Sequence, residues 1–365
     1  MTAASQSIPV TQDGNRTAPL RVFPYGDYQH RQPLAYVPIR RACAGRIEIT
    51  ERMEQAQVVV IAHVKDLKAH GEKLRRSLHP DQTLVLLSEE PFWDTAWGGV
   101  PGSATLTRET PDGPITARQL NHQTSRVFEF KAIPYFPLTD RSFFNRYALR
   151  FTRNARLDAE AWRTVFARRR DIVFMATRRE SEKYDVAWPM HEIYGLSALR
   201  TRIAMACEDE RVRRIGLRWN EEPPRQDLPD WHLDKLLQLE DNCRVLSAIE
   251  NTHQRNYLTE KLFDAFAIGA IPLYVAAPSH RVHEVVPDGG WINLFGLEPE
   301  TAAQRILDFE PDAAFCEAYA KTQRRLARLF GSVGTLRREY ERLASDLEAS
   351  LRAAANHPQG TSTAA

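Results

Sequence analysis

Apolar runs and amphipathic stretches alternate along most of this chain of 365 residues. A continuous β-branched run at 56–64, AQVVVIAHV, and a second apolar run at 82–88, QTLVLLS, predict strands that are buried on both faces. Between them, KDLKAHGEKLRRSL has the apolar period of an amphipathic helix. This order predicts a parallel sheet with a crossover helix in the first part of the chain.

The same alternation begins again near Asp171 and continues to about residue 295. The predicted helices of this series are SALRTRIAMACED, WHLDKLLQLED and a segment that begins near residue 259. The predicted strands are DIVFMAT, RRIGLRW, CRVLSAI, IPLYVA and GGWINLF. Two such series predict an α/β fold of two Rossmann-like domains, with parallel sheets that face a cleft, followed by a helical C-terminal tail.

These patterns also predict the domain boundaries. Both ends of the chain, 1–18 and 356–365, are polar and rich in small residues, so we expect them to be disordered. The Gly/Pro/Thr-rich sequence from 98 to 113 predicts a long loop or an inserted hairpin. The expected ordered units are an N-terminal domain at 19–165, a C-terminal domain at 166–330 and a helix at 331–355.

Composition narrows the class of protein. The net charge of +2 is too balanced to indicate a nucleic-acid partner. Four widely separated cysteines predict buried free thiols in a reducing compartment. The chain shows neither a secretory signal pattern at its start nor an apolar run long enough to span a membrane, so we expect a cytoplasmic protein. Composition does not predict the oligomeric state.

The C-terminal segment RRLARLFGSVGTLRREYERLASDLEASL permits two interpretations. As a basic amphipathic helix it could lie on the inner face of a membrane and give peripheral association. Its acidic residues, Glu339, Glu341, Asp346 and Glu348, instead favour a solvated helix that packs on its own domain or on a partner.

A polar cluster opens the helix that follows the strand CRVLSAI. In NYLTEKLFDAFAIGAIPLYVAAP, Thr259 can cap the helix, and Glu260 stands in its first turn. Lys261 opposes the helix dipole there, which suits an anion bound at the helix N-terminus. Asn251, and Tyr257 with its hydroxyl donor, would face the same crevice, since ligands bind beyond the carboxyl ends of parallel strands. A capped core helix and a phosphate site both explain this pattern.

The longer segment SAIENTHQRNYLTEKLFDAFAIGAIPLYVAAPS resembles the donor-binding motif of the α1,3/4-fucosyltransferases, glycosyltransferase family 10, in its bacterial form. The resemblance is clear from about residue 171 to 295 and faint before that. The positions that match the family pattern are Glu250, Asn251, Tyr257, Thr259, Glu260, Lys261, Gly269, Pro272, Tyr274, Pro278 and Asn293.

The resemblance implies a GT-B fold and a reaction. The C-terminal domain would bind GDP-fucose, and the N-terminal domain would bind a saccharide acceptor, with envelope polysaccharide or lipopolysaccharide assembly as the setting. Fucose would pass to an acceptor hydroxyl with inversion. Neither a metal nor another cofactor would be required, which agrees with the lack of an Asp-x-Asp motif and the isolation of His280 and His283.

The resemblance also implies roles for individual residues. Lys261 would bind the donor diphosphate together with Arg200, because guanidinium groups bind phosphate in a bidentate manner. Glu260 would lie near the sugar or the ribose. The donor site would be completed by Asn251, Tyr257 and Thr259, with Glu250, Arg178, Arg179 and Arg202 as further candidates.

The general base is expected at the end of the strand QTLVLLS, which continues into EEPFW. A carboxylate at this place points into the crevice between the domains, and burial would raise its pKa toward that of a useful base. Glu89 aligns with the family glutamate, and Glu90 is an alternative. Ordinary loop carboxylates would give the same sequence. His63 ends the neighbouring strand, where a core histidine is the more frequent finding.

Two departures from the family keep other functions open. The family has Tyr-Trp-Gly where this chain has Tyr274-Val275-Ala276, so the donor could be another nucleotide sugar. The N-terminal part of the chain resembles nothing closely, which leaves a non-catalytic nucleotide-sugar-binding protein as a further hypothesis.

Overall fold

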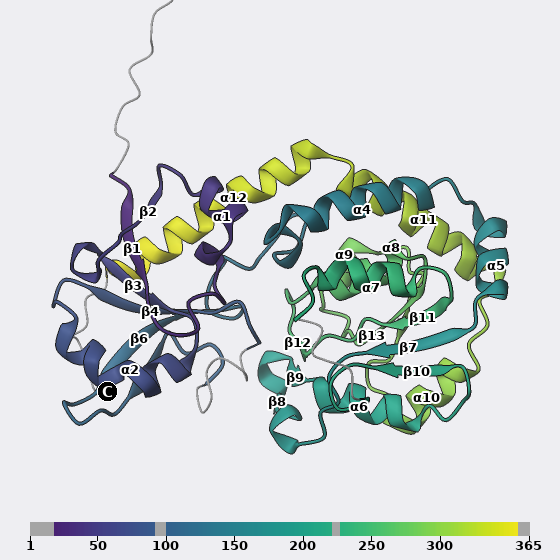
Figure 1. Cartoon of the computed structure of the whole chain (residues 1–365), viewed down its shortest axis with the longest axis horizontal. Helices are drawn as coiled ribbons and strands as arrows, with labels where there is room; N and C mark the ends of the chain where they lie inside the picture. The colour runs from purple at the N-terminus through teal and green to yellow at the C-terminus, as the bar shows by residue number, and fades with distance from the viewer. Residues whose placement is uncertain (1–17, 92–99, 221–226, 357–365) are drawn as a thin grey trace, which may run out of the picture.

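The computed structural model describes residues 18–91, 100–220 and 227–356, which form two larger sheets and one small sheet (Figure 1). The ends that were predicted to be disordered, 1–18 and 356–365, lie outside the described residues except for positions 18 and 356.

The first sheet has six strands, and its two central strands are the apolar runs identified in the sequence. Every residue of these two strands is buried, because helices or loops cover both faces of the sheet. All pairs are parallel except β5 with β6, which form the inserted hairpin. In spatial order the strands are β2 (Ile47–Ile49), β1 (Leu20–Pro24), β3 (Val58–Ile61), β4 (Thr83–Leu87), β6 (Ile115–Leu120) and β5 (Thr105–Arg108).

The second sheet has five strands that are all parallel. In spatial order they are β10 (Val212–Ile215), β7 (Asp171–Met175), β11 (Cys243–Ser247), β13 (Ile271–Tyr274) and β14 (Ile292–Asn293). A small antiparallel sheet of β12 (Thr252–His253), β9 (Ile193–Gly195) and β8 (Ala187–Trp188) lies beside it. The two parallel sheets with crossover helices confirm the predicted α/β fold.

Helices connect these strands and cover the sheets. The first half contains α1 (Val37–Ala42) and α2 (Val64–Ser77). The second half contains α6 (Ser197–Ala206), α7 (Trp231–Leu239), α8 (Glu260–Ala267), α9 (Val282–Val285) and α10 (Pro299–Leu307). The short 3-10 helices are η1 (Pro33–Ala35), η2 (Met53–Gln55), η3 (Phe136–Leu138), η4 (Glu182–Tyr184) and η5 (Pro189–His191).

The remaining helices do not all pack in the half of the molecule whose strands adjoin them in the sequence (Figure 1). Helices α4 (Arg141–Asn154) and α5 (Ala159–Arg168) pack against α11 (Ala313–Phe330) in the second half. The aromatic rings of Tyr147 and Phe151 meet Phe330 of α11 at centroid distances of 5.1 and 5.5 Å. The helices between 141 and 168 therefore pack with elements of the second half, and the domain boundary at 165 stays a prediction.

The last helix, α12 (Val333–Ala355), returns to the first half, where it contacts α1 and β4. Its apolar residues Leu343, Leu347 and Leu351 are fully buried. The buried Glu339 accepts a hydrogen bond of 2.8 Å from the backbone N–H of Lys131. The apolar face that a membrane-bound helix would need is thus covered by the protein itself. Among the described helices, none is long and apolar enough to cross a membrane.

The four cysteines, Cys43, Cys207, Cys243 and Cys316, are all buried and free, as the sequence predicts.

Candidate active site

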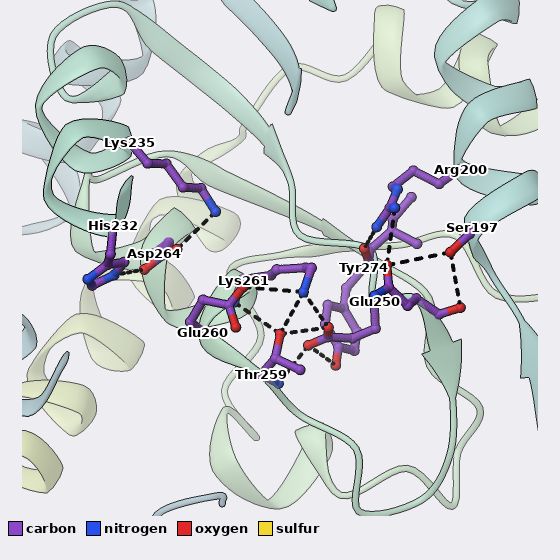
Figure 2. Close-up of polar contacts among 12 residues, drawn as sticks. Ser197, Arg200, His232, Lys235, Glu250, Thr259, Glu260, Lys261, Asp264 and Tyr274 are labelled. Carbon is purple, nitrogen blue, oxygen red and sulfur yellow. Dashed lines mark hydrogen bonds and ion pairs between the residues drawn. The ribbon is translucent and has the colours of Figure 1, made fainter. Parts of the chain in front are cut away.

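The polar cluster of the sequence motif lies where β11 ends and α8 begins (Figure 2). The buried carboxylate of Glu250 accepts hydrogen bonds of 2.7 Å from the backbone N–H and from the hydroxyl of Thr259. The Nζ of Lys261 donates to the Thr259 hydroxyl at 3.0 Å and lies 3.3 Å from both Glu250 and Glu260. Thr259 also caps the helix as predicted. Glu250, a weaker candidate in the sequence, is therefore the group that holds the start of α8.

The charges of this cluster perturb one another. Burial raises the pKa of Glu250, although Lys261 opposes the shift. Burial acts to lower the pKa of Lys261, but Glu260 and Glu250 more than offset it and raise that pKa. Burial acts to raise the pKa of Glu260, and Lys261 and Lys235 outweigh it, so this pKa is lowered. The cluster thus holds a charged lysine at the helix N-terminus, where an anion is favoured.

Arg200 reaches this edge of the sheet from α6. Its NH1 donates to the backbone carbonyl of Ile249 at 2.7 Å, and its NH2 donates to Oδ1 of Asn251 at 3.2 Å. Burial lowers the pKa of Arg200 to about 10, and the nearby Arg179 adds to the shift. Its buried Nε has no hydrogen-bond partner among the described residues. A buried guanidinium with an unused N–H matches a phosphate oxygen well.

The other candidate arginines lie differently. Arg202 is half exposed and pairs with Asp185 at 3.0 Å, so it is directed away from the cluster. Arg178 pairs with Glu180 at 2.9 Å and lies over the ring of Trp219. Both residues were weaker candidates, and the structure assigns them these partners outside the cluster.

Arg179, rather than Arg178, approaches the cluster. Its NH1 lies 3.4 Å from the hydroxyl of Ser197. That hydroxyl is in turn 3.5 Å from Oδ1 of Asn251. Arg179 therefore adds positive charge to the same edge of the sheet as Arg200.

Tyr257 joins the two halves. Its buried ring packs edge-on against Phe136 at a centroid distance of 5.4 Å and against His122 at 5.1 Å. Its position in the motif is therefore explained by packing, and its predicted role as a hydroxyl donor stays a prediction.

Glu89 lies just beyond β4 in the first half and is buried. Its two carboxylate oxygens accept hydrogen bonds from the hydroxyls of Tyr36 and Tyr135. The ring Nε2 of His122 lies 2.8 Å from the backbone carbonyl of Glu89. Burial raises the pKa of Glu89 to about 8, although the two tyrosine hydroxyls oppose the shift. A carboxyl group with such a pKa exchanges its proton near neutral pH, as a general base must.

The candidates from both halves meet in one cavity of about 930 Å³. Glu89 and the half-buried Glu90 line it from the first half, and Glu260 lines it from the second. Its volume lies in the range of about 300–1,000 Å³ that is typical of ligand sites. The sequence placed these carboxylates in separate domains, and the fold brings them to a common space.

A buried network below Glu260 escaped the sequence analysis. Asp264, one turn further along α8, is 2.7 Å from Nε2 of His232 and 2.9 Å from Nζ of Lys235, and it accepts a hydrogen bond of 2.7 Å from the hydroxyl of Tyr147. Burial acts to raise the pKa of Asp264, but Lys235 and His232 bring it down to about 2. The sequence offered one signal for this network, which is the carboxylate of Asp264 among the apolar positions of α8. The network ties α4 and α7 to the helix that carries Lys261.

The two residues that depart from the family pattern follow Tyr274, whose hydroxyl lies 3.5 Å from Oε1 of Glu250. Val275 and Ala276 are buried. The side chain of Asn293 accepts a hydrogen bond of 3.1 Å from the N–H of Ala276 and donates one of 2.8 Å to its carbonyl. The side chain of Asn293 therefore holds the backbone at Ala276.

The histidines considered in the sequence have local roles. His63 caps α2, where its Nδ1 accepts a hydrogen bond of 3.0 Å from the N–H of Lys65. His280 accepts from the N–H of Val282, and His283 lies 3.1 Å from the carbonyl of Ala277.

Comparison with known proteins agrees with this site. Residues 219–328 match the family model described as "Glycosyltransferase family 10 (fucosyltransferase) C-term". The matched segment contains β11, α8 and the motif from Glu250 to Lys261. The match over this segment is to a family of glycosyltransferases, and it confirms the family resemblance that the sequence motif predicts.

Three solved structures share the arrangement only distantly. An α1,3-fucosyltransferase with GDP-fucose is 13% identical with a TM-score of 0.40, covering 94% of each chain. An α1,3-fucosyltransferase is 15% identical with a TM-score of 0.41, covering 86% of this chain and 83% of that chain. An α1,3-fucosyltransferase with GDP is 13% identical with a TM-score of 0.37, covering 95% and 94%. These scores are too low to transfer residue roles. No curated protein matches the sequence.

Proposed function

We propose that this protein transfers fucose from GDP-fucose to a hydroxyl group of a saccharide, with inversion and without a metal ion. The observation that carries the proposal is a pair of cations, the buried Arg200 and the half-buried Lys261, near the end of β11 and the start of α8, where the matched segment places its motif. Two fixed cations and a helix N-terminus can supply the positive charge that the departing diphosphate needs.

The two carboxylates that line the shared cavity support the following reaction. The acceptor oxygen attacks the anomeric carbon of fucose on the face opposite the diphosphate. The bond from that carbon to the diphosphate oxygen breaks, and GDP leaves with the electron pair beside Lys261 and Arg200. Glu89 takes the proton of the acceptor hydroxyl. A single displacement of this kind inverts the anomeric carbon. Glu260 supports the positive charge that develops on the sugar.

Calorimetric titration in EDTA with GDP, GDP-fucose, GDP-mannose and UDP-glucose tests the donor. Selective binding of GDP and GDP-fucose is the expected result, and Lys261→Ala should weaken both. Loss of binding in EDTA that returns with Mg²⁺ would contradict metal independence. Arg202→Ala serves as the control, because that arginine pairs with Asp185 away from the cluster.

The stretch Val275-Ala276 supports a second candidate, a transferase of the same fold that uses another nucleotide sugar. Both residues are buried, and they follow Tyr274, whose hydroxyl lies 3.5 Å from Oε1 of Glu250 in the donor cluster. The same titration separates the two candidates, since preferential binding of GDP-mannose or UDP-glucose would replace fucose as the transferred sugar.

A non-catalytic binding protein is distinguished by the carboxylates of the cavity. If Glu89 or Glu90 is the base, its replacement by glutamine should abolish transfer while the donor still binds. Unchanged turnover in both variants would show that neither Glu89 nor Glu90 is the base. Donor binding by a wild-type protein that turns over no substrate would favour the binding protein.

A further inference from the structure

The cavity shared by the two halves has a second group of side chains that the donor chemistry does not use. Four half-buried aromatic residues line it together with the carboxylates, and they come from four different elements. These residues are Tyr36 beside α1, Phe136 in η3, Phe143 in α4 and Trp231 in α7.

Phe143 and Trp231 form one aromatic surface on the side of this cavity that the second half of the molecule provides. Their ring centroids are 6.3 Å apart with an interplanar angle of 62°. The ring centroid of His232 lies 4.3 Å from that of Phe143, so the imidazole packs against the phenyl ring. The C–H face of a pyranose ring is weakly positive and apolar, so it packs well against the negative face of an aromatic ring.

Carboxylates surround this aromatic surface, and they match the other part of a sugar. Each carboxylate oxygen accepts hydrogen bonds and donates none, so hydroxyl groups are suitable partners. Glu90 and Glu260 line the same cavity as the general base candidate Glu89. A saccharide on the aromatic surface would therefore present hydroxyls to these groups.

The charge of the cavity selects against an anionic ligand. The lining contains five carboxylates and three arginines, so its formal charge is −2 when all are ionised and −1 while Glu89, whose pKa is about 8, holds its proton. The carboxylates are Glu89, Glu90, Asp140, Asp230 and Glu260, and the arginines are Arg41, Arg141 and Arg146.

Arg146 is the arginine beside the aromatic surface, and it is already engaged. Its guanidinium forms a bidentate ion pair with Asp230. Its NH1 also lies 3.0 Å from Nδ1 of His232, which must accept, because a guanidinium only donates. The proton of this imidazole therefore sits on Nε2 and is donated to Asp264. Arg146 is therefore engaged by Asp230 and His232 and is not available to bind an acidic sugar.

We propose that the aromatic surface of Phe143 and Trp231 is the acceptor subsite and that it takes an uncharged saccharide, with its reactive hydroxyl directed to Glu89 or Glu90. This inference rests on the proposed transfer of fucose. It assigns part of acceptor recognition to the second half of the molecule, whereas the family resemblance predicts acceptor binding by the N-terminal domain.

The test measures fucose transfer from GDP-fucose to defined oligosaccharides. Lactose, maltotriose and chitotriose serve as neutral probes, and 3′-sialyllactose and maltotriose phosphate serve as their anionic counterparts. We expect transfer to at least one neutral probe and at least tenfold lower kcat/KM for the anionic ones. Trp231→Ala should raise the acceptor KM at least tenfold, and Trp231→Phe should raise it no more than about threefold. The Kd of GDP-fucose and its slow hydrolysis in water should not change in either variant.

Two further variants keep the test decisive. Phe143→Leu keeps the apolar volume but removes the ring, so it should raise the acceptor KM even if Trp231→Ala does not fold. Leu237→Ala lies on the exposed side of α7 and should leave every parameter unchanged.

Four results would overturn the inference. They are preferred transfer to an anionic probe, an unchanged acceptor KM in both ring variants, a matching loss in Leu237→Ala, and no transfer to any neutral probe by a protein that binds GDP-fucose. A wild-type protein that does not bind GDP-fucose would instead reject the proposed function itself.

Discussion

We predict that the hydroxyl of Tyr135 sets the pH at which Glu89, the proposed base, loses its proton. This hydroxyl donates to one carboxylate oxygen of Glu89, and it opposes the effect of burial, which raises the pKa of Glu89 to about 8. A hydrogen bond to a charged group contributes about 1.5–3 kcal/mol, and one pKa unit corresponds to about 1.4 kcal/mol. Tyr135→Phe should therefore raise the pKa of Glu89 by a further ~1–2 units.

The consequence appears in the pH profile of the reaction. The base must be ionised, so kcat/KM falls on the acid side of its pKa. In Tyr135→Phe the acid limb should move to higher pH by the same ~1–2 units. Activity at pH 7 should fall about 10- to 100-fold, and it should approach the wild-type value at alkaline pH.

The assay is GDP release with GDP-fucose and the best neutral acceptor, measured from pH 5.5 to pH 10. Tyr340→Phe is a suitable control, because that hydroxyl bonds the carbonyl of Leu138 away from Glu89. An acid limb that stays in place, or that moves to lower pH, would refute the role of Tyr135. A uniform loss at every pH would show instead that the hydroxyl supports only the structure.

Three further variants test the site and its supports. Lys261→Ala removes a cation from the proposed diphosphate site and should raise the Kd of GDP about 10- to 100-fold by calorimetry, and an unchanged Kd would reject this contact. Asp264→Asn leaves Lys235 buried without its ion pair and should lower the free energy of unfolding by about 3–5 kcal/mol in urea titrations; an unchanged midpoint would mean that the network is not stabilising. The folded-state pKa of Glu89 lies above its usual value, so the folded state binds the proton more tightly and loses stability as pH rises from about 4.5 to about 8. Glu89→Gln should remove that loss, becoming a few kcal/mol more stable than wild type at pH 8.5 with little difference near pH 4.5, and equal slopes of stability against pH would contradict it.

The sequence by itself determined the parts of this protein that depend on local patterns. The continuous apolar runs predict β3 and β4, because a strand that is buried on both faces needs apolar residues at every position. The motif around Thr259 and Lys261 predicts a capped helix with a cation at its start, since both features lie within one helical turn. The family match over 219–328 rests on the same contiguous segment.

Only the tertiary structure decided how distant elements meet. Glu89 obtains its partners from Tyr36 and Tyr135, which are 53 and 46 residues away, and no spacing along the chain indicates such a pairing. The same holds for Asp264, whose partners come from α4 and α7, and for α12, whose apolar face is covered by the opposite half of the molecule. Periodicity shows that a face must be buried, whereas the packing of the whole chain determines which surface buries it.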